Sequence, residues 1–287
     1  MKTLERHPCF NVEAHHKFGR IHLPVAPFCN IHCRYCDRKY DCVNESRPGV
    51  SSRIVNPDEG IQRVRVAMDR GKNISVIGVA GPGDPLANNS TFEFFEMVKQ
   101  EFSEVMLCLS TNGLYLPEKL SLIKNLGIRT ITITINAATE ETAQKIYSWV
   151  SYGGEVYRER DAAECLLCNQ WKGLRKAVKE GFAVKVNTVL IPTVNEEEIP
   201  LIAWLAGVFG ATTMNIIPLI PQAEFKHLQR PSYEMLQRIR ENCSHYIHQI
   251  THCKHCRADA YGVLGEDKDI ELELLNAKIG EVYCEYV

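Results

Sequence analysis

The stretch Pro27-Phe28-Cys29-Asn30-Ile31-His32-Cys33-Arg34-Tyr35-Cys36 carries three cysteines, with three and then two residues between them. Three thiolates on one short loop can each hold one iron of a cubane iron–sulfur cluster. A four-iron cluster usually takes four protein thiolates, so three leave one iron open to a substrate or cofactor. The spacing therefore predicts a catalytic cluster rather than a sealed electron carrier.

Strand and helix patterns alternate along the chain from about residue 54. Short β-branched, apolar runs predict buried strands, and longer runs that begin at a capping residue predict helices. The predicted strands cover residues 20–25, 74–79, 105–109, 130–135, 183–190 and 212–217. The predicted helices cover residues 57–71, 91–102, 117–126, 139–147, 161–180, 196–209 and 232–249, and residues 152–160 are expected to form a polar excursion.

Repeated strand–helix units imply a parallel sheet with helices outside it. Six units predict an α/β fold, a partial (βα)6 barrel of the TIM type rather than a closed barrel of eight. In such folds the chemistry lies at the carboxyl ends of the strands. The cysteine loop and the turns at residues 81–84 and 110–113 each follow a predicted strand. We therefore expect them to meet at one mouth of the barrel.

The strand–helix pattern ends near Pro218, where prolines punctuate an irregular stretch. We expect residues 1–217 to form the barrel with an N-terminal extension. Residues 218–287 are expected to form a C-terminal extension that carries Cys253 and Cys256 and covers the barrel mouth. Both extensions are expected to bind clusters.

The composition is that of an ordinary globular protein: 287 residues, 45% hydrophobic, with a net charge of −2. This charge gives no broad electrostatic case for binding nucleic acid or an anionic membrane. No run approaches the roughly 18 apolar residues of a membrane span, and the N-terminus lacks the apolar core of a secretion signal. We therefore expect a cytoplasmic protein. Twelve cysteines in that compartment indicate metal binding rather than disulfides.

The cysteine triad, with Tyr35 just before its last member, resembles the signature loop of the radical SAM superfamily. That resemblance implies a [4Fe-4S] cluster whose open iron chelates S-adenosylmethionine (SAM) and reduces it to a 5′-deoxyadenosyl radical. The alternative is a zinc site, but zinc loops usually supply two pairs of ligands. The resemblance also implies a set of SAM-binding residues, each of which has an ordinary turn or core interpretation as well. They are Tyr35, Gly81, Asp84, Ser110, Asn112, Asn136, Asn187 and Ile216.

Further motifs are similar to those of one family, the NifB nitrogenase cofactor maturases, in its short stand-alone form. They include His7-Pro8-Cys9, Arg38-Lys39-Tyr40-Asp41-Cys42, Asn44-Glu45-Ser46-Arg47-Pro48-Gly49 and His252-Cys253-Lys254-His255-Cys256-Arg257-Ala258-Asp259-Ala260. The resemblance implies an enzyme that fuses two [4Fe-4S] clusters into an [8Fe-9S-C] core. One SAM donates the methyl carbon and a second supplies the radical. Three clusters are then required, one permanent and two precursors, with cluster-delivery and cofactor-carrier proteins as partners.

The resemblance also implies cluster ligands beyond Cys29, Cys33 and Cys36. The further metal candidates are Cys9, His22, Cys42, Cys108, Cys253 and Cys256. A neutral imidazole binds iron more weakly than a thiolate, so we expect His22 and Cys42 on one precursor cluster, because a weak ligand can let go during fusion. Cys253 and Cys256 are expected on the other precursor cluster, while Cys9 and Cys108 stay unallotted.

Conversion of a methyl group to carbide removes protons, so a group with acid–base function is expected. Glu45 and Cys108 are the catalytic candidates; a surface ion pair and an apolar strand residue are their ordinary interpretations. Cys165 and Cys168 fall in a predicted helix and are expected to pack there. Cys243 and Cys284 have no assignment.

Three alternatives remain. The first is another radical SAM enzyme with auxiliary clusters, of the type that starts molybdenum cofactor synthesis, which is expected to carry three cysteines in its tail. The second is a non-catalytic iron–sulfur scaffold, which does not cleave SAM. The third, a zinc-binding interaction module, is poorly supported by the strand–helix array.

Overall fold

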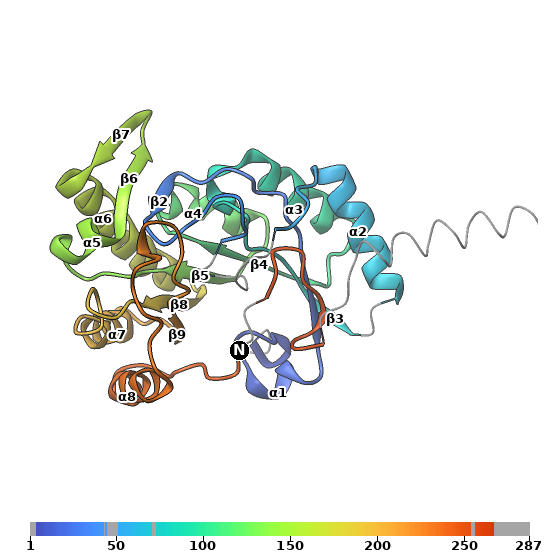
Figure 1. Ribbon diagram of the computed structural model, residues 1–287. Coiled ribbons are helices and arrows are strands. Elements are labelled where there is room, and N and C mark those ends of the chain that lie inside the picture. The colour runs from blue at the N-terminus through green and yellow to red at the C-terminus, as the bar shows by residue number, and fades with distance from the viewer. Residues whose placement is uncertain (1–3, 43, 45–50, 71–72, 254–255, 267–287) are drawn as a thin grey trace, which may run out of the picture.

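The computed structural model describes residues 4–42, 44, 51–70, 73–253 and 256–266. Its central feature is a curled sheet with the strand order β10-β1-β3-β4-β5-β8-β9 (Figure 1). The six strands from β1 to β9 in this order pair in parallel. They are β1 (Gly19–His22), β3 (Ile74–Val79), β4 (Met106–Thr111), β5 (Thr130–Thr134), β8 (Ala183–Leu190) and β9 (Thr213–Pro218). The predicted partial (βα)6 barrel is confirmed.

Helices connect these strands and lie around the outside of the sheet (Figure 1). Their bounds are α1 (Val12–His15), α2 (Pro57–Arg70), α3 (Asn89–Glu101), α4 (Leu116–Asn125), α5 (Glu140–Ile146), α6 (Glu159–Lys179), α7 (Ile199–Val208) and α8 (Tyr233–Ser244), with short 3-10 turns η1 (Leu4–Arg6), η2 (Pro85–Ala87) and η3 (Ala223–Phe225). The capping signals act as expected: the Asn56 side chain accepts a hydrogen bond from the Glu59 backbone N–H over 2.8 Å.

Side chains alternate between the two faces of the sheet. The outward residues, such as Ile131 and Val186, are apolar and belong to the main core beneath the helices. Alternate positions on the same strands carry polar groups, such as Thr132 and Lys185, and they are buried too. Because successive residues of a strand point to opposite faces, the inner face of the half-barrel is lined by polar side chains. A polar interior can receive a charged ligand.

A second, three-stranded sheet was not expected. It consists of β2 (Ile31–Cys33), β6 (Tyr147–Tyr152) and β7 (Glu155–Arg158). The polar excursion expected at residues 152–160 is wrong, because β6 and β7 form a hairpin around Gly153 and Gly154. Both glycines have positive φ (62° and 87°), as a tight hairpin turn requires. This sheet packs β2, and with it the cysteine loop, against the second core cluster.

The C-terminal segment also contributes to the main sheet. Its strand β10 (Tyr261–Val263) pairs antiparallel with β1, placing Gly262 opposite Arg20. The predicted helix 232–249 is too long: α8 ends at Ser244, and the following residues pair with the edge strand β9, where the Met214 N–H donates to the His248 carbonyl over 2.9 Å. A domain boundary at residue 217 stays a prediction.

Across the described ranges, none of the helices is both long and apolar enough to span a bilayer.

Candidate functional site

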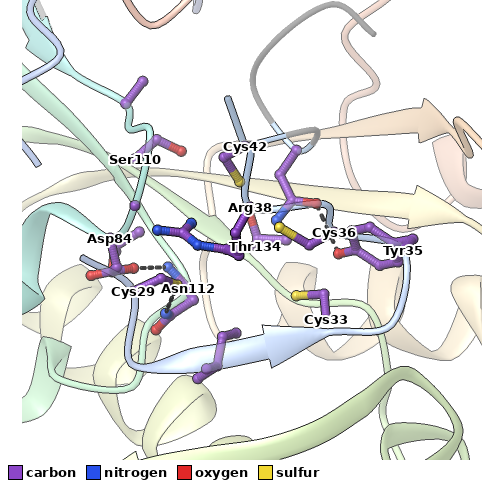
Figure 2. A pocket seen from close by; sticks show the side chains of 15 residues that line it. Cys29, Cys33, Tyr35, Cys36, Arg38, Cys42, Asp84, Ser110, Asn112 and Thr134 are labelled. Carbon is purple, nitrogen blue, oxygen red and sulfur yellow. Dashed lines mark hydrogen bonds between the residues drawn. The ribbon is translucent and has the colours of Figure 1, made fainter. Parts of the chain in front are cut away.

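Two neighbouring cavities lie inside the half-barrel. The first is lined by the three cysteines of the signature loop together with Cys42 (Figure 2). The ends of β3, β4 and β5 supply its opposite side through Asp84, Ser110 and Thr134, among others. The cysteine loop and both predicted turns therefore meet at the carboxyl ends of the strands.

The triad thiols are donors that fit a four-iron cluster. Burial raises the pKa of Cys29 to about 12, and burial together with the neighbouring Cys36 and Cys29 thiols raises the pKa of Cys33 well above its ordinary value. Without a cation such thiols stay neutral at physiological pH; a metal ion deprotonates a coordinating thiol. Figure 2 shows the Arg38 guanidinium among these sulfurs, and it lowers the pKa of Cys36 against the larger effect of burial. The residues present therefore suit an iron cluster held by one loop.

The turn after β3 is built against the cysteine loop. The Gly83 N–H donates to the Ala26 carbonyl over 2.6 Å, and the Asp84 N–H donates to the Phe28 carbonyl over 2.9 Å. A Cβ atom at Gly83 would lie 2.1 Å from the Phe28 oxygen. Only glycine allows so close an approach of two backbones, so Gly83 sets the distance between the loop and the sheet. Gly81 begins the same turn with a φ of +147°.

Asp84 joins the turns after β3 and β4. Its carboxylate accepts hydrogen bonds from the Thr111 hydroxyl over 2.8 Å, the Asn112 backbone N–H over 2.6 Å and the Leu86 N–H over 2.9 Å. Burial raises the pKa of Asp84 to about 6, although these hydrogen bonds oppose the rise. Asn112 in turn lies with Nδ2 3.8 Å from Cys29 Sγ. Asp84 therefore positions the residues that face the cluster loop.

Tyr35 is fully buried, and its hydroxyl lies between two asparagines. It donates to Asn44 Oδ1 over 2.8 Å and accepts from Asn136 Nδ2 over 2.6 Å. Asn187 reaches the same residue from β8, with Nδ2 3.4 Å from the Asn44 carbonyl. Ile216 lies in the apolar layer under the helices. Of the SAM candidates, Tyr35, Asp84, Ser110 and Asn112 line the first cavity, and Asn187 lines the second.

The second cavity is formed by the N-terminal segment, the barrel interior and the C-terminal segment. Three cysteines and two histidines line it, with a buried lysine and two asparagines. Its lining residues are Cys9, His22, Asn44, Lys185, Asn187, Ile250, His252, Cys253, Cys256 and Leu264. Asn44 lines both cavities, so the two are direct neighbours.

His22 and Cys108 lie in one row across the sheet. β1 pairs His22 with Gly78, and β4 pairs Gly78 with Cys108. A Cβ at Gly78 would meet the His22 ring at 3.1 Å, so glycine leaves room between the imidazole and the thiol. Burial raises the pKa of Cys9 to about 12; Lys185 opposes the rise, while Cys256 and Cys108 add to it. Cys9 is therefore close to Cys108 and Cys256.

The metal candidates thus fall into two groups. Cys42 lines the first cavity with the triad, whereas Cys9, His22, Cys253 and Cys256 line the second. His22 and Cys42, predicted on one precursor cluster, line different cavities. Their shared assignment stays a prediction.

Several other residues need a separate account. Glu45, the acid–base candidate, and Cys284 lie outside the described residues. Cys165 and Cys168 lie on α6, as expected, but the packing expected of Cys168 is wrong, because its side chain is exposed. Cys165 is half-buried, and Cys243 is buried in the core.

Sequence reasoning missed several residues at or beside these cavities, among them Lys185, Arg20 and Asn44. Lys185 and Arg20 are charged residues inside apolar strands, a pattern that could have drawn attention to them because buried charges need a partner. Arg20 is fully buried, and its guanidinium bonds to the Gly262 carbonyl over 2.7 Å. Asn44 was noted only as part of a motif. Its position between the two cavities results from tertiary contacts, which have no local signal in the sequence.

Known proteins resemble this chain in sequence and fold. The radical SAM superfamily profile matches residues 23–205. The FeMo cofactor biosynthesis protein NifB of Klebsiella pneumoniae is 42% identical over 278 residues, which cover 94% of this chain and 59% of that protein. NifB of Methanocaldococcus infernus is 41% identical over 290 residues, covering 96% of this chain and 95% of that protein. The chain therefore spans well under two thirds of the first relative and nearly all of the second.

Solved structures show the same fold at low identity. The crystal structure of Streptococcus suis SuiB bound to S-adenosylmethionine superposes with a TM-score of 0.60 and 11% identity, over 84% of this chain and 52% of that chain. At that identity the likeness concerns the fold alone.

Proposed function

The chain belongs to the NifB family of the radical SAM superfamily and is a radical SAM enzyme, and we propose that it makes the carbide-centred [8Fe-9S-C] core from which the nitrogenase cofactor is assembled. Two [4Fe-4S] clusters are the substrates. One SAM is the methyl donor, and a second is the source of the 5′-deoxyadenosyl radical. Membership of the superfamily implies SAM and one resident [4Fe-4S] cluster; the total of three clusters is part of the proposal.

The observation that supports this proposal best is the pair of cavities that share Asn44. A single-cluster radical enzyme needs only the first. A second, thiol-lined cavity beside it provides a place for an iron–sulfur substrate next to the site of radical formation. Proximity of this kind matters because the radical must reach its target before it meets solvent.

In the first cavity, the triad would hold the resident cluster, which when bound supplies an electron to the sulfonium of SAM. Asp84, through Thr111 and Asn112, holds the polar groups of the strand ends in place. Tyr35 closes the boundary with the second cavity through Asn44. The proposed SAM contacts remain Tyr35, Gly81, Asp84, Ser110, Asn112, Asn136, Asn187 and Ile216, of which Tyr35, Asp84, Ser110 and Asn112 line this cavity.

In the second cavity, Cys9, Cys253 and Cys256 provide thiolates and His22 a weaker imidazole ligand. Product release favours such a mixed set, because the imidazole can leave iron more readily than a thiolate. Cys42 and Cys108 are proposed as further ligands of the precursor clusters. Cys108 and Glu45 are the proposed proton acceptors, since carbide formation strips the methyl carbon of its hydrogens.

The experiment is product analysis of the reconstituted protein with dithionite and SAM under anaerobic conditions. We expect both S-adenosylhomocysteine, from methyl transfer, and 5′-deoxyadenosine, from the radical step. Carbon label from the SAM methyl group should appear in the protein-bound cluster. Deoxyadenosine alone would point to another type of radical SAM enzyme, such as the molybdenum-cofactor type. No cleavage at all would support a non-catalytic scaffold.

Matched variants divide the two cavities. Cys33→Ala should abolish both products, because it removes a triad ligand. His22→Ala should lower iron content without loss of the triad cluster's electron paramagnetic resonance signal; unchanged iron content would reject His22 as a ligand. The cytoplasmic location, and delivery and carrier proteins as partners, belong to the same proposal.

A further inference from the structure

Helix α7 is apolar around its whole circumference. Its sequence, Ile-Pro-Leu-Ile-Ala-Trp-Leu-Ala-Gly-Val, contains no charged residue. One face packs into the core through Ile199, Ile202, Ala203 and Ala206. A surface helix normally carries polar residues on its other face. Here that face presents Leu201, Trp204 and Val208, which are 40%, 46% and 61% exposed.

Helix α6 lies beside this apolar face and carries an ordered row of charges. From Asp161 to the end of the helix, its exposed positions follow helical spacing along one stripe: Asp161, Glu164, Cys168, Lys172, Arg175 and Lys179. From Asp161 onward the stripe is acidic before Cys168 and basic after it, while Arg160 at the start of the helix is paired with Glu140. Such a division alone is ordinary, because acids suit the start of a helix and bases its end. Beside an exposed apolar helix, however, the same division of charge can orient a partner on this surface.

The two helices form one continuous surface. Trp171 of α6 packs edge-on against Phe209 at the end of α7, with ring centroids 5.7 Å apart, and the Arg175 guanidinium lies 5.2 Å from the centre of the same ring. Lys172, Arg175 and Val208 line one shared hollow. Both helices immediately precede strands of the parallel pair β8 and β9. They therefore run in the same direction across this surface.

The charges on this surface are complementary to those of the same surface on a second copy of the chain, when that copy is rotated by 180°. Cys168 and Trp171 line an acidic hollow with Glu140, Glu141 and Glu164 on one side and a basic hollow with Lys172 and Arg175 on the other. A second copy of α6 in antiparallel orientation, with Cys168 opposite Cys168, brings Glu164 opposite Lys172. It also brings Asp161 opposite Arg175, because each pair is equally distant from Cys168 along the chain.

The same rotation also matches the apolar helix with itself. Since α6 and α7 run in the same direction, a twofold axis that makes the two copies of α6 antiparallel also makes the two copies of α7 antiparallel. The Leu201–Trp204 side of one copy then contacts the same side of the other. Closed twofold interfaces have this self-complementary property. Within the described part of the chain, no ion pair uses Glu164 or Lys172. Both charges are therefore available to a second copy.

We propose that α6 and α7 form a twofold interface with a second copy of this chain, with Trp204 in its apolar part and Glu164–Lys172 pairs across the axis at Cys168. The 21 residues of α6 span about 31 Å and the 10 residues of α7 about 15 Å. Two helices of these lengths can bury an area near or below the roughly 800 Å² per partner of a standard protein–protein interface. We therefore expect dissociation in the micromolar range. The inference does not depend on the proposed function.

The primary test is anaerobic sedimentation velocity of the reconstituted chain. The protein concentration is varied from about 1 to about 100 μM, a range that brackets a micromolar dissociation constant. We expect a monomer–dimer equilibrium that Trp204→Glu abolishes. Lys172→Glu should weaken it roughly tenfold, because two like charges then face each other at two symmetric positions. The double variant Glu164→Lys with Lys172→Glu should restore it. Glu96→Lys, an exposed charge reversal on α3, should change nothing.

Two results would overturn the proposal. One is a monomer throughout the titration, or a dimer indifferent to Trp204→Glu. The other is a double charge reversal that is weaker than Lys172→Glu alone, which would reject the antiparallel register. A short bismaleimide gives an independent reading: it should join two chains at Cys168, and Cys168→Ser should prevent this while Cys165→Ser should not. SAM cleavage by Lys172→Glu should equal that of the wild type, which separates this test from that of the proposed function.

Discussion

Arg20 donates a hydrogen bond from Nη2 to the sulfur of Cys256 over 3.0 Å, across a sequence separation of 236 residues. The contact exists because β10 pairs with β1 and brings the C-terminal segment against the first strand of the barrel. A guanidinium donor stabilises a thiolate. The N-terminal strand therefore holds a proposed cluster ligand of the C-terminal segment in place.

Replacement of Arg20 by Gln should empty the second cavity and spare the first. Gln keeps one donor but loses the charge and the fork that bonds both Cys256 and the Gly262 carbonyl. We expect a loss of about four of roughly twelve irons per chain (three clusters of four), measured by iron analysis. The triad signal should persist in electron paramagnetic resonance. Arg65→Gln, at an exposed ion pair with Glu101, is the control, and equal iron in both variants would contradict the role of Arg20.

Lys185 supplies a positive charge to the second cavity from near the start of β8. It is only 6% exposed, lines the cavity, and lowers the pKa of the nearby Cys9 against the effect of burial. Lys185→Met keeps the length of the side chain and removes the charge. Loss of a cation disfavours the reduced, more negative cluster, so the reduction potential in this cavity should fall by on the order of 100 mV. A redox titration followed by electron paramagnetic resonance measures the shift; an unchanged potential would exclude an electrostatic role.

Gly83 should tolerate no side chain. A Cβ there would lie 2.1 Å from the Phe28 carbonyl oxygen, which belongs to the backbone of the cysteine loop. Gly83→Ala should therefore displace the loop, with loss of the absorbance near 400 nm that marks the triad cluster and a lower melting temperature. Gly127→Ala is the matched control: its φ is +90° but nothing lies within 4 Å of the added carbon. It should cost about 1 kcal/mol and keep the cluster. Gly83 itself has no positive φ, so equal effects of the two variants would show that the close contact with Phe28 does not matter.

The barrel could be predicted from the sequence because its signals are local. Buried parallel strands such as Ile74–Val79 are β-branched apolar runs, and caps such as Asn56 mark the helix starts. The β6–β7 hairpin had a local signal as well, Gly153-Gly154 between aromatic strands, but the apolar run before it also suits a helix. Helix–strand ambiguity of this kind is resolved by tertiary packing.

The arrangement of the site depends on contacts that have no local signal. The cysteine triad lies on one loop and could be predicted as one cluster site from spacing alone. The grouping of Cys9 with Cys256 depends instead on β10 pairing with β1, and that pairing joins segments at opposite ends of the chain. Residue type suggested these ligands, but their allocation between the two cavities requires the fold.

Asp84 should make stability depend on pH between about 4 and 7. Its pKa rises from an ordinary 3.8 to about 6 in the folded protein, chiefly through burial. Below the lower value the carboxyl is neutral in both states and carries no cost. As pH rises through this range the unfolded chain ionises first, so unfolding releases a proton and becomes easier. Above pH 6 the cost levels off at about 3 kcal/mol, since one pKa unit corresponds to about 1.4 kcal/mol.

Asp84→Asn isolates this effect, because the amide does not titrate and all other groups cancel in the comparison. At low pH the variant should be less stable than the wild type, because the substitution disturbs the hydrogen bonds that the Asp84 carboxyl accepts from Thr111 and Asn112. The wild type's advantage over the variant should then shrink by about 3 kcal/mol from pH 3 to pH 7. Urea unfolding of the cluster-free protein at several pH values measures it. If the difference in unfolding free energy between wild type and variant did not change with pH, the hydrogen bonds to the carboxylate would fully offset the effect of burial on the pKa. If the difference grew with pH, the folded protein would favour the carboxylate.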